Sequence, residues 1–546
     1  MSDNSFMDHR ALTALALVAA GCRVAREPER DPDGAVPVRI DLGAKGRPID
    51  PRIYGAAYAG AAGGAVRCPL NRFGGNNITR YNWRENADNK GADWFFESIG
   101  YPDPTPGGQA REFVAGSRKA GSAPMITVPM IGWTARLGPK RSRTWSYSVR
   151  KYGKQEKVDP EGWSDCGNGK RPDGKDIAGN DPNDANRAVD ETFYRPWVEA
   201  LTREFGSIEY WLLDNEPGLW HSTHRDVLPE GVRAGDLLNR MLRTARMIKS
   251  VDPKAKVCGF EEWGWTGYRY SGHDARIGAR DGWGNFLSPL PDRKLMGGED
   301  ITPWLLRRMH EEGRKEGRRL LDVFTLHYYP QGGEFGGGTD TATCLRRNRS
   351  TRSLWDPDYR DETWINDRVR LIPRMREWVQ RNHPGIPMGI TEYNWGAETH
   401  INGATAQADV LGIFGREGLD LAARWAHPDA KTPTHKVFEL FRSVDDGKRG
   451  FGDRSIPCVV PDCDDVSAFA AIDSQDGALT VVVVAKALEG SRTVRLDIPG
   501  FRSAGTAAAW QVNSENRIVR LPAGKDPLRI TVPAPSITLL RLPSTV

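Results

Sequence analysis

Two glutamates stand where short apolar runs break off, and this placement suits acid–base chemistry. Residues 208–213 form an apolar run that fits one buried strand, and the run stops before Glu216-Pro217-Gly218, which cannot continue a strand interior. Residues 387–391 likewise end at Glu392. Hydrolysis of a glycosidic bond needs such a pair, because one carboxyl protonates the leaving oxygen and the other attacks the anomeric carbon or activates water. A salt bridge to an arginine is the structural alternative for each glutamate.

Eight apolar runs of strand length recur between longer segments with helical periodicity. The runs cover residues 53–58, 66–73, 124–131, 208–213, 255–260, 321–326, 387–391 and 421–425. Helical periodicity is seen in residues 190–205, 234–251, 301–316, 367–381 and 404–418. This alternation predicts an α/β fold, a parallel (β/α)8 barrel over residues 51–460. Glu216 would follow the fourth strand and Glu392 the seventh, so both would face one cleft at the carboxyl ends of the strands.

The pattern changes near residue 461. Short β-type runs at residues 466–472, 479–487, 492–498, 506–512, 528–532 and 536–542 are divided by Gly, Asp and Pro turns, which predicts an antiparallel β-sandwich over residues 461–546. Residues 36–42 alternate apolar and polar side chains like a half-buried strand. We expect residues 35–50 to contain a strand that joins the β-sandwich.

The first residues predict export. Residues 1–22 contain an apolar run at 11–20 that ends at Gly21-Cys22 and is too short to span a bilayer. Small residues before a cysteine resemble the lipobox of bacterial lipoproteins, so Cys22 is a candidate lipid anchor on a secreted or cell-surface protein. Asp3 and Asp8 weaken the match and leave open an ordinary secretory signal or a misassigned start codon. Residues 23–34 are a charged tether.

Composition narrows the partners. The net charge of +5 over 546 residues, without a dominant basic block, argues against nucleic acid. We expect a monomer. The other cysteines show no metal-ligand spacing, although two of them, Cys458 and Cys463, are close enough in sequence to close a small disulfide loop. Cys68 and Cys258 fit buried free thiols, and Cys166 and Cys344 carry no motif.

A long connection at residues 132–190 is rich in Gly, Asp and Lys. A loop of this length in a compact domain is usually functional or partly disordered. Asp181 and Asp184 could hold structural calcium there, with a solvated turn as the alternative.

Six segments together resemble glycoside hydrolase family 44. They are residues 72–83 (RFGGNNITRYNW), 92–96 (ADWFF), 213–226 (LDNEPGLWHSTHRD), 262–265 (EWGW), 350–356 (STRSLWD) and 391–395 (TEYNW). The resemblance implies a retaining endo-β-1,4-glucanase or xyloglucanase with a barrel and a β-sandwich, in which Glu216 is the acid/base and Glu392 the nucleophile. Retention places the two carboxyl groups about 5 to 5.5 Å apart. The charge of Glu392 would help to raise the pKa of Glu216 until a sugar esterifies Glu392.

Further residues are candidates for supporting roles. Asn215 would contact a sugar 2-hydroxyl, as in related barrel glycosidases. Tyr328 would donate a hydrogen bond to Glu392, a role that His327 or Tyr329 could fill instead because strand neighbours point to opposite faces. Arg72 would keep the nucleophile charged or form an ordinary ion pair. Glu262 would shape the cleft, whereas Glu398 has no evident role. Six of the eighteen tryptophans are candidate sugar platforms, and we expect half of these to be core: Trp83, Trp94, Trp220, Trp265, Trp395 and Trp425.

The two carboxyls supply all the proton and nucleophile chemistry, so we expect no required cofactor. Two other readings of the function stay open. One is a hydrolase of another β-1,4 polysaccharide such as mannan or xylan, because the carboxylate pair does not select the sugar. The other is a non-catalytic glycan-binding surface protein.

Overall fold

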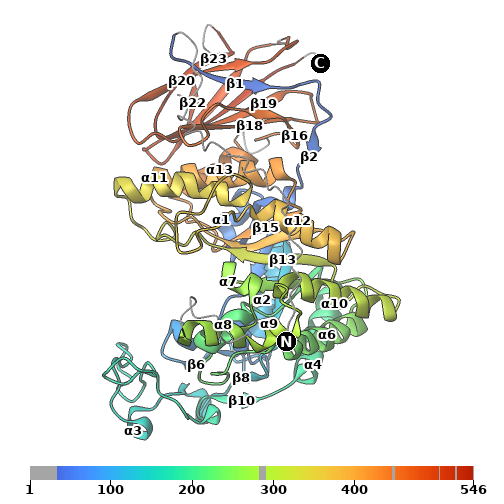
Figure 1. Ribbon diagram of the computed structural model, residues 1–546, viewed down its shortest axis with the longest axis vertical. Coiled ribbons are helices and arrows are strands. Elements are labelled where there is room, and N and C mark those ends of the chain that lie inside the picture. Colours follow the sequence, from blue (N-terminus) through green and yellow to red (C-terminus); the bar gives the residue numbers. More distant parts are fainter. Residues whose placement is uncertain (1–32, 282–289, 445–448, 503–504, 523–525, 545–546) are drawn as a thin grey trace, which may run out of the picture.

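The structure is a computed structural model that describes residues 33–281, 290–444, 449–502, 505–522 and 526–544. Eight parallel strands close into a barrel, and a β-sandwich sits against it (Figure 1). In chain order the barrel strands are β3 (Gly55–Ala57), β4 (Leu70–Phe73), β7 (Ala123–Val128), β11 (Tyr210–Leu213), β12 (Lys256–Glu262), β13 (Val323–Tyr328), β14 (Met388–Tyr393) and β15 (Leu421–Arg424). Each lies within or overlaps one of the eight predicted runs. The predicted barrel with a sandwich is therefore confirmed.

The barrel strands are apolar runs because they are covered on both faces. Every residue of β11, β13 and β14 is buried, as expected for parallel strands packed between a barrel interior and surrounding helices. Alternate side chains of β11 separate accordingly: Tyr210 and Leu212 join one apolar cluster with Leu70 and Met125, while Trp211 and Leu213 join the main core.

Five of the helices around the barrel match the predicted helical segments: α4 (Glu191–Phe205), α6 (Ala234–Val251), α10 (Ile301–Lys315), α12 (Leu371–Asn382) and α13 (Ile401–Glu417). The start of α4 is fixed by Asp190, whose side chain accepts a hydrogen bond from the Thr192 amide. Sequence analysis missed α2 (Gly108–Lys119), α11 (Thr341–Ser350) and α14 (Pro433–Arg442). The first two have a weaker amphipathic contrast than the predicted helices α4, α6, α10 and α12.

The long connection after β7 is folded. It contains β8 (Trp133–Ala135), β9 (Thr144–Trp145), α3 (Val149–Tyr152) and β10 (Asn186–Ala188). Strand β8 pairs with β10, and β9 extends the hairpin of β5 (Ala87–Asn89) and β6 (Glu97–Gly100). These small sheets lie at the end of the molecule opposite the sandwich (Figure 1).

The sandwich draws strands from both ends of the chain. One sheet has the order β17-β1-β20-β23 and the other β2-β16-β18-β19-β24-β21-β22. Their bounds are β1 (Val36–Ile40), β2 (Arg47–Pro48), β16 (Arg454–Ile456), β17 (Cys458–Val459), β18 (Val466–Ile472), β19 (Leu479–Ala485), β20 (Ser491–Asp497), β21 (Ala508–Val512), β22 (Ile518–Leu521), β23 (Arg529–Pro533) and β24 (Ser536–Leu542).

Three details differ from the predicted sandwich. Its strands begin at β16, before residue 461, because β16 and β17 already pair in its sheets. The N-terminal strand β1 runs parallel to β20, with Val36 opposite Val494, so the sandwich is not wholly antiparallel. The short strand β22 was also missed.

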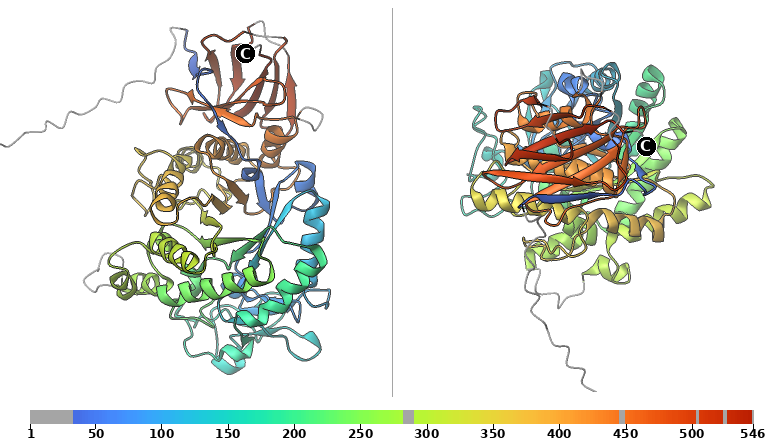
Figure 2. Two further views of the ribbon diagram at one scale, coloured as in Figure 1. Left: turned by 90° about the vertical axis from the view of Figure 1, so that its right-hand side faces the viewer. Right: turned by 90° about the horizontal axis from the view of Figure 1, so that it is seen from above.

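Helix α13 joins the barrel to the sandwich. Its residues 401–415 are all buried, and it packs against β18, β19 and β24 (Figure 2). Gly412 allows the close approach, because a Cβ atom there would lie 2.2 Å from the Phe469 ring. In the same contact the Asp409 carboxylate accepts hydrogen bonds from Lys486 Nζ at 2.7 Å and from Ser467 Oγ at 2.5 Å, and both members of the ion pair are buried.

The thiols and the N-terminal prediction complete the description. Within the described residues Cys458 and Cys463 are free rather than joined in a disulfide, and Cys68 and Cys258 are buried free thiols as expected. The export signal, Cys22 and most of the tether lie outside the described residues. None of the described helices combines the length and the apolar character that crossing a membrane requires.

Candidate active site

Glu216 is held by an irregular backbone at the end of β11. Both Asp214 and Glu216 have positive φ values, 64° and 45°, so the strand cannot continue past them. The Asp214 carboxylate accepts hydrogen bonds from the Met130 and Ile131 amides, which follow β7. The Glu216 amide donates to the Glu261 carbonyl oxygen at 2.9 Å. The turn is thus fixed to the strand on either side, and the Glu216 side chain is only 11% exposed.

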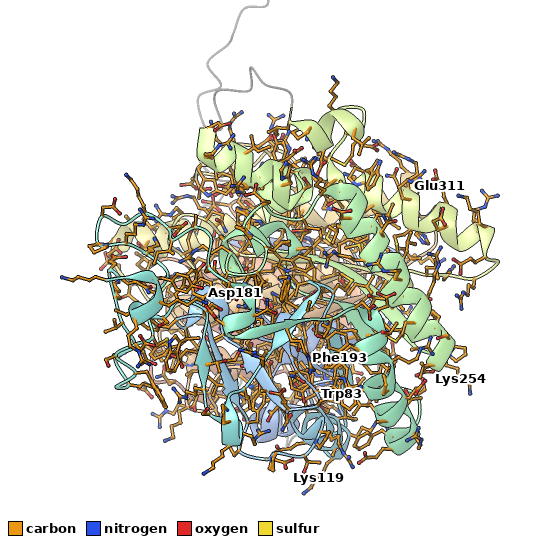
Figure 3. All side chains as sticks on the ribbon, turned by 90° about the horizontal axis from the view of Figure 1, so that it is seen from below. Trp83, Lys119, Asp181, Phe193, Lys254 and Glu311 are labelled. Carbon is orange, nitrogen blue, oxygen red and sulfur yellow. The ribbon has the colours of Figure 1, made fainter. Side chains whose placement is uncertain are left out.

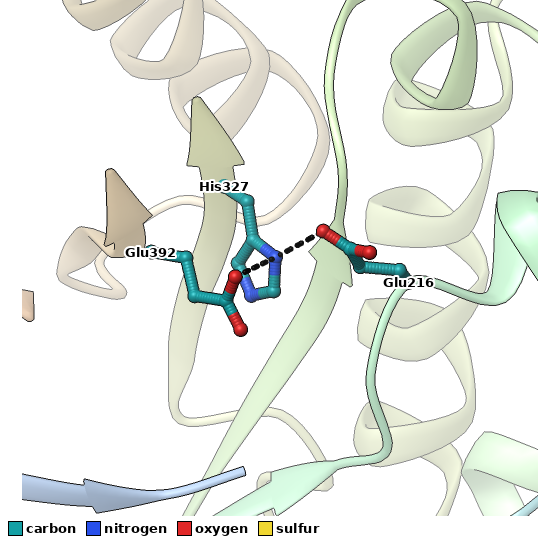
Figure 4. A group of neighbouring side chains, drawn as sticks. All are labelled: Glu216, His327 and Glu392. Atoms are coloured by element: carbon teal, nitrogen blue, oxygen red, sulfur yellow. Dashed lines mark hydrogen bonds and ion pairs between the residues drawn. The ribbon is translucent and has the colours of Figure 1, made fainter. Parts of the chain in front are cut away.

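Glu392 lies on β14 and faces Glu216 across the end of the barrel. One carboxylate oxygen of each and a ring nitrogen of His327 all lie within 4.8 Å of one another (Figure 4). The Glu392 side chain is 6% exposed. The structure therefore brings together the two glutamates that the sequence singled out.

Arg72 connects the nucleophile candidate to its neighbours. From β4 its Nη1 donates to Glu392 Oε1 at 2.6 Å, and its Nη2 donates to Asn215 Oδ1 at 2.9 Å and to Glu261 Oε2 at 3.3 Å. The guanidinium is fully buried. A buried guanidinium at this distance favours the ionised form of a carboxylate. The two predicted roles of Arg72, an ion pair and support of Glu392, are therefore the same contact.

His327 lies at the centre of the carboxylates. Its Nδ1 is 2.9 Å from Glu216 Oε1 and 3.5 Å from Glu392 Oε2, and its Nε2 is 3.1 Å from Glu261 Oε2. Burial alone would lower its pKa, but the charge of Glu392 and the hydrogen bonds with Glu216 and Glu261 raise the pKa to about 9. The raised pKa favours the imidazolium form of His327, in which both ring nitrogens donate; Arg72 Nη2 also lies 3.3 Å from Nε2.

The environment separates the two glutamates chemically. Burial, together with the negative charge of Glu392, raises the pKa of Glu216, and the His327 hydrogen bond only partly opposes this. Glu392 instead accepts from Arg72 and from the Tyr329 hydroxyl at 2.8 Å. One carboxyl is thus poised to keep a proton while the other is surrounded by donors, which is the division that an acid and a nucleophile need.

Among the described residues, Glu216, His327 and Glu392 are also the only group with the composition of a metal cluster. The electrostatics do not suit a cation there. His327 is protonated, and Arg72 forms an ion pair with Glu392, so two positive charges already face these oxygens. A divalent ion would be repelled by them.

The hydrogen-bond donor to Glu392 is Tyr329, one of the predicted alternatives, and the choice of Tyr328 is wrong. Tyr328 is the last residue of β13, and its ring is buried against Trp395, with ring centroids 5.6 Å apart. Tyr329 comes after the strand and is half-buried, with Phe335 against its ring at 5.1 Å. Strand alternation therefore sends the two tyrosines to opposite sides.

The six tryptophans divide between core and rim. Trp220, Trp265 and Trp395 are buried, and the indole N–H groups of Trp220 and Trp395 donate to the Asn215 carbonyl and to Ser350 Oγ. These three belong to the core, which agrees with the expectation that half of the six candidates would be core. Trp425 is half-buried, with the Arg72 guanidinium 5.9 Å from its ring.

Trp83 and Trp94 are also half-buried. Trp83 lies beside Phe193 and donates its indole N–H to the Phe193 carbonyl (Figure 3). Trp94 follows Asp93, whose carboxylate accepts from the Asn76 amide at 3.1 Å, while Asn76 accepts from Asn215 at 3.0 Å. Asp93, the residue before Trp94, is thus linked to Asn215 through Asn76.

Other predicted residues have partners of their own. Glu262 is buried, accepts from the Gly218 amide at 3.2 Å and shapes the turn after Glu216. Glu398 forms an ion pair with the buried Arg424 at 3.2 Å. Asp181 accepts from the Asn183 amide, and Asp184 from Lys151 Nζ at 2.6 Å. Calcium binding by Asp181 and Asp184 remains a prediction. In the structure their carboxylate oxygens accept the hydrogen bonds just described.

Sequence reasoning gave Glu261 no role, although it contacts both Arg72 and His327. It also missed Asn76, which holds the Asn215 amide. The signal for Glu261 was its place at the end of the fifth barrel run, next to Glu262. The sequence could not show which of the two adjacent glutamates contacts Arg72 and His327.

Comparisons with known proteins bear on the family of the chain. The family model described as glycoside hydrolase family 44 matches residues 87–332. The crystal structure of CelM2, a bifunctional glucanase-xylanase from a metagenome library, is 50% identical, covers 94% of this chain and 99% of that chain, and superposes with a TM-score of 0.90. A Paenibacillus polymyxa xyloglucanase from glycoside hydrolase family 44 is 25% identical, with 93% of this chain and 99% of that chain covered and a TM-score of 0.73.

Among curated relatives, endoglucanase A of Paenibacillus lautus is 29% identical over 497 residues. The match covers 85% of this chain and 65% of that protein, so the chain spans less than two thirds of the relative's length. The family model and the close likeness along almost the whole length of a solved structure lead to one conclusion. The chain belongs to glycoside hydrolase family 44.

Proposed function

We propose that the protein is a retaining, endo-acting glycoside hydrolase of β-1,4-glucan backbones, cellulose-like or xyloglucan. One observation carries the mechanism: oxygens of Glu216 and Glu392 lie within 4.8 Å of each other. Retaining enzymes hold their carboxyl groups about 5 to 5.5 Å apart, whereas inverting enzymes need about 6.5 to 9.5 Å to admit water. The short spacing leaves Glu392 as nucleophile and Glu216 as acid and base.

The first step forms a glycosyl-enzyme ester. A Glu392 oxygen bonds to the anomeric carbon while the glycosidic C–O bond breaks, and Glu216 gives its proton to the departing oxygen. Arg72 and Tyr329 donate hydrogen bonds to Glu392 and hold its carboxylate in position before attack. Burial and the charge of Glu392 raise the pKa of Glu216, which favours the protonated form that this step requires.

The second step returns both residues to their starting state. Glu216, now a carboxylate, takes a proton from water as the water oxygen bonds to the anomeric carbon and the ester bond breaks. Glu392 leaves as a carboxylate, and Glu216 is again protonated. The anomeric configuration is retained after the two displacements.

Three related names support a glucan backbone: a glucanase-xylanase, a xyloglucanase and an endoglucanase. The glucanase-xylanase also supports xylan as an alternative substrate. Mannan is a further alternative, because the carboxylate pair does not select the sugar. A non-catalytic glycan-binding protein is the remaining alternative. It would bind polysaccharide without creating new reducing ends.

The test is release of reducing ends from xyloglucan, carboxymethyl cellulose, glucomannan and xylan, with Glu216→Gln as the blank. We expect release from the glucans that disappears in the variant. Release from xylan or glucomannan alone would overturn the glucan assignment, and no release from any of the four would favour the binding protein. Proton NMR of the first product must show the β-anomer; an α-anomer would exclude the retaining mechanism.

We also propose that the reaction needs no metal or organic cofactor, because two carboxyls, a guanidinium and an imidazolium carry the chemistry. Dialysis against EDTA should leave kcat unchanged. If calcium binds near Asp181 and Asp184, its removal should lower Tm without changing kcat in the temperature range where the protein stays folded. A loss of kcat that calcium restores would contradict the proposal.

For location, we propose export to the cell surface or medium as a monomer, with a lipid on Cys22. The support is the apolar run at residues 11–20 that ends at Gly21-Cys22. Mass spectrometry of the protein from its native host tests this. A diacylglyceryl group on an N-terminal Cys22 is expected, release into the medium without lipid would indicate an ordinary secretory signal, and an intact residue 1 would contradict export.

A further inference from the structure

Glu261 is a buried carboxylate that the proposed reaction steps do not use. It lies near the end of β12, where the pairing register with β13 shifts between Phe260 and Glu262, and its φ is 58°. Its side chain is fully buried. Its carbonyl oxygen accepts from the Glu216 amide, so Glu261 also touches the acid/base candidate through the backbone.

Four donors converge on its carboxylate. Arg72 Nη2 lies at 3.3 Å, His327 Nε2 at 3.1 Å and Thr391 Oγ1 at 2.7 Å, and Thr325 Oγ1 also donates to it. Burial alone would raise the pKa of Glu261, but the His327 hydrogen bond and the Arg72 charge outweigh burial and hold the pKa below its usual range. Glu261 is therefore a permanent negative charge inside the barrel.

The charges of this cluster cancel only when Glu261 is counted. The proposed first step starts from a cationic Arg72 and His327, an anionic Glu261 and Glu392, and a protonated Glu216, so two positive charges face two negative charges. In the glycosyl-enzyme Glu392 is a neutral ester, but Glu216 has given up its proton and replaces the lost negative charge. Since a net charge is costly in a buried site, a fixed Glu261 keeps both stages of the cycle neutral.

We propose that Glu261 is a positioning residue whose negative charge keeps His327 an imidazolium throughout the cycle, so that its Nδ1–H stays directed at Glu216 Oε1. The role rests on the proposed function of Glu216. With Nδ1–H on Oε1, the reactive proton of Glu216 belongs on Oε2. A neutral His327 could present an unprotonated Nδ1 and compete for that proton.

Ionisable groups around His327 come from several strands and must be considered together. They are Arg72 of β4, Glu216 after β11, Glu261 and Glu262 of β12, Tyr329 after β13 and Glu392 of β14. Burial raises the pKa of Glu262 and that of Tyr329 well above their usual values, which favours the neutral form of each. In the proposed arrangement Glu261 balances the second positive charge.

The test is Glu261→Gln, read by the pH profile of kcat/KM. Removing the charge leaves the cluster with one excess positive charge, so a proton leaves it more readily. We expect the alkaline limb to move down by at least one pH unit, with activity at the acid side within tenfold of the unaltered protein. Glu377→Gln is the matched control, because it removes an ion-paired carboxylate on α12 that contacts Arg370 and not this cluster.

A profile that keeps its shape, or a rate lowered equally at every pH, would overturn the role. NMR of 15N-labelled histidine reads the charge of His327 without any glycan: an imidazolium at pH 7 is expected in the unaltered protein and a neutral ring in Glu261→Gln. This readout decides on Glu261 even if the protein cleaves no glucan. If Glu261→Gln does not fold, Glu261→Asp, whose shorter side chain withdraws from His327, should shift the alkaline limb in the same direction by a smaller amount.

Discussion

The proton on Glu216 depends on a neighbour that changes charge during the reaction. Burial and the negative charge of Glu392 both raise the pKa of Glu216. When Glu392 is esterified the repulsion ends and the pKa must fall, since an anion then meets one negative charge fewer. The same residue can therefore be an acid in one step and a base in the next.

Glu392→Gln imitates the esterified state. We expect the pKa of Glu216 to fall in this variant, measured by 13C NMR of labelled glutamate, and kcat to fall by on the order of 10⁴-fold or more. The fold should persist, because Glu392 lies at the end of a barrel strand and contributes little to the core. Circular dichroism measures whether the variant is folded. A pKa of Glu216 that stays unchanged would show that burial alone sets it.

Tyr329→Phe tests the hydrogen bond that steadies the nucleophile. The hydroxyl lies 2.8 Å from Glu392 Oε2, and a hydrogen bond to a charged group contributes about 1.5 to 3 kcal/mol. Its loss should lower kcat/KM by roughly tenfold to a hundredfold.

Tyr101→Phe is the control for that change, since Tyr101 donates to Asp88 and not to the reacting glutamates. Equal effects of the two substitutions would assign the loss to folding. At this scale the sequence predicted Glu216, Glu392, Arg72 and His327, because each ends or follows a barrel run. It could not separate Tyr328 from Tyr329, or rim from core tryptophans, since those choices depend on side-chain direction and on packing between distant segments.

At the scale of elements, α13 is the piece on which barrel and sandwich depend. The barrel runs and the five strongly periodic helices could be predicted from sequence because continuous burial and amphipathic spacing leave clear patterns. The start of α13 could not, since Asn402 is held there by Arg347 and Asn348 of α11, a contact between segments far apart in the chain. Helix α14 was missed although its own sequence is amphipathic. The role of β1 was visible in its alternation, but its parallel pairing with β20 was not.

Lys486→Met tests the ion pair in that contact. The substitution removes the cation beside Asp409, while the methionine side chain fills the space of the lysine. The negative charge of Asp409 then remains buried without its cation. We expect a loss of about 3 to 5 kcal/mol in the free energy of unfolding, measured by urea denaturation. The double variant with Asp409→Asn should recover much of the loss. A single variant as stable as the unaltered protein would mean that water reaches this contact.

For the molecule as a whole, the shared core predicts one cooperative unfolding event. Because α13 is buried by barrel and sandwich together, neither part can lose its partner without exposing apolar surface. Calorimetry should show a single transition, with catalytic activity lost over the same temperatures. Two separated transitions would show that the parts are stable independently.

A chain that ends at residue 453, before β16, is the stricter version of this experiment. It retains every barrel strand but leaves α13 without the strands that cover it. We expect it to be insoluble or to lack fixed tertiary structure, judged by near-ultraviolet circular dichroism. A soluble and active shortened chain would contradict the shared core.

The pairing of β1 with β20 also has a consequence for synthesis on the ribosome. Strand β1 is made before the barrel, whereas β20, its neighbour along four pairs of residues, is made after it. The nascent chain must therefore complete the barrel while its first strand has no partner. The short length of β1 and the exposed Arg39 within it reduce the hazard of mispairing during that wait. Once β20 has left the ribosome, it can pair with β1 and complete this sheet of the sandwich.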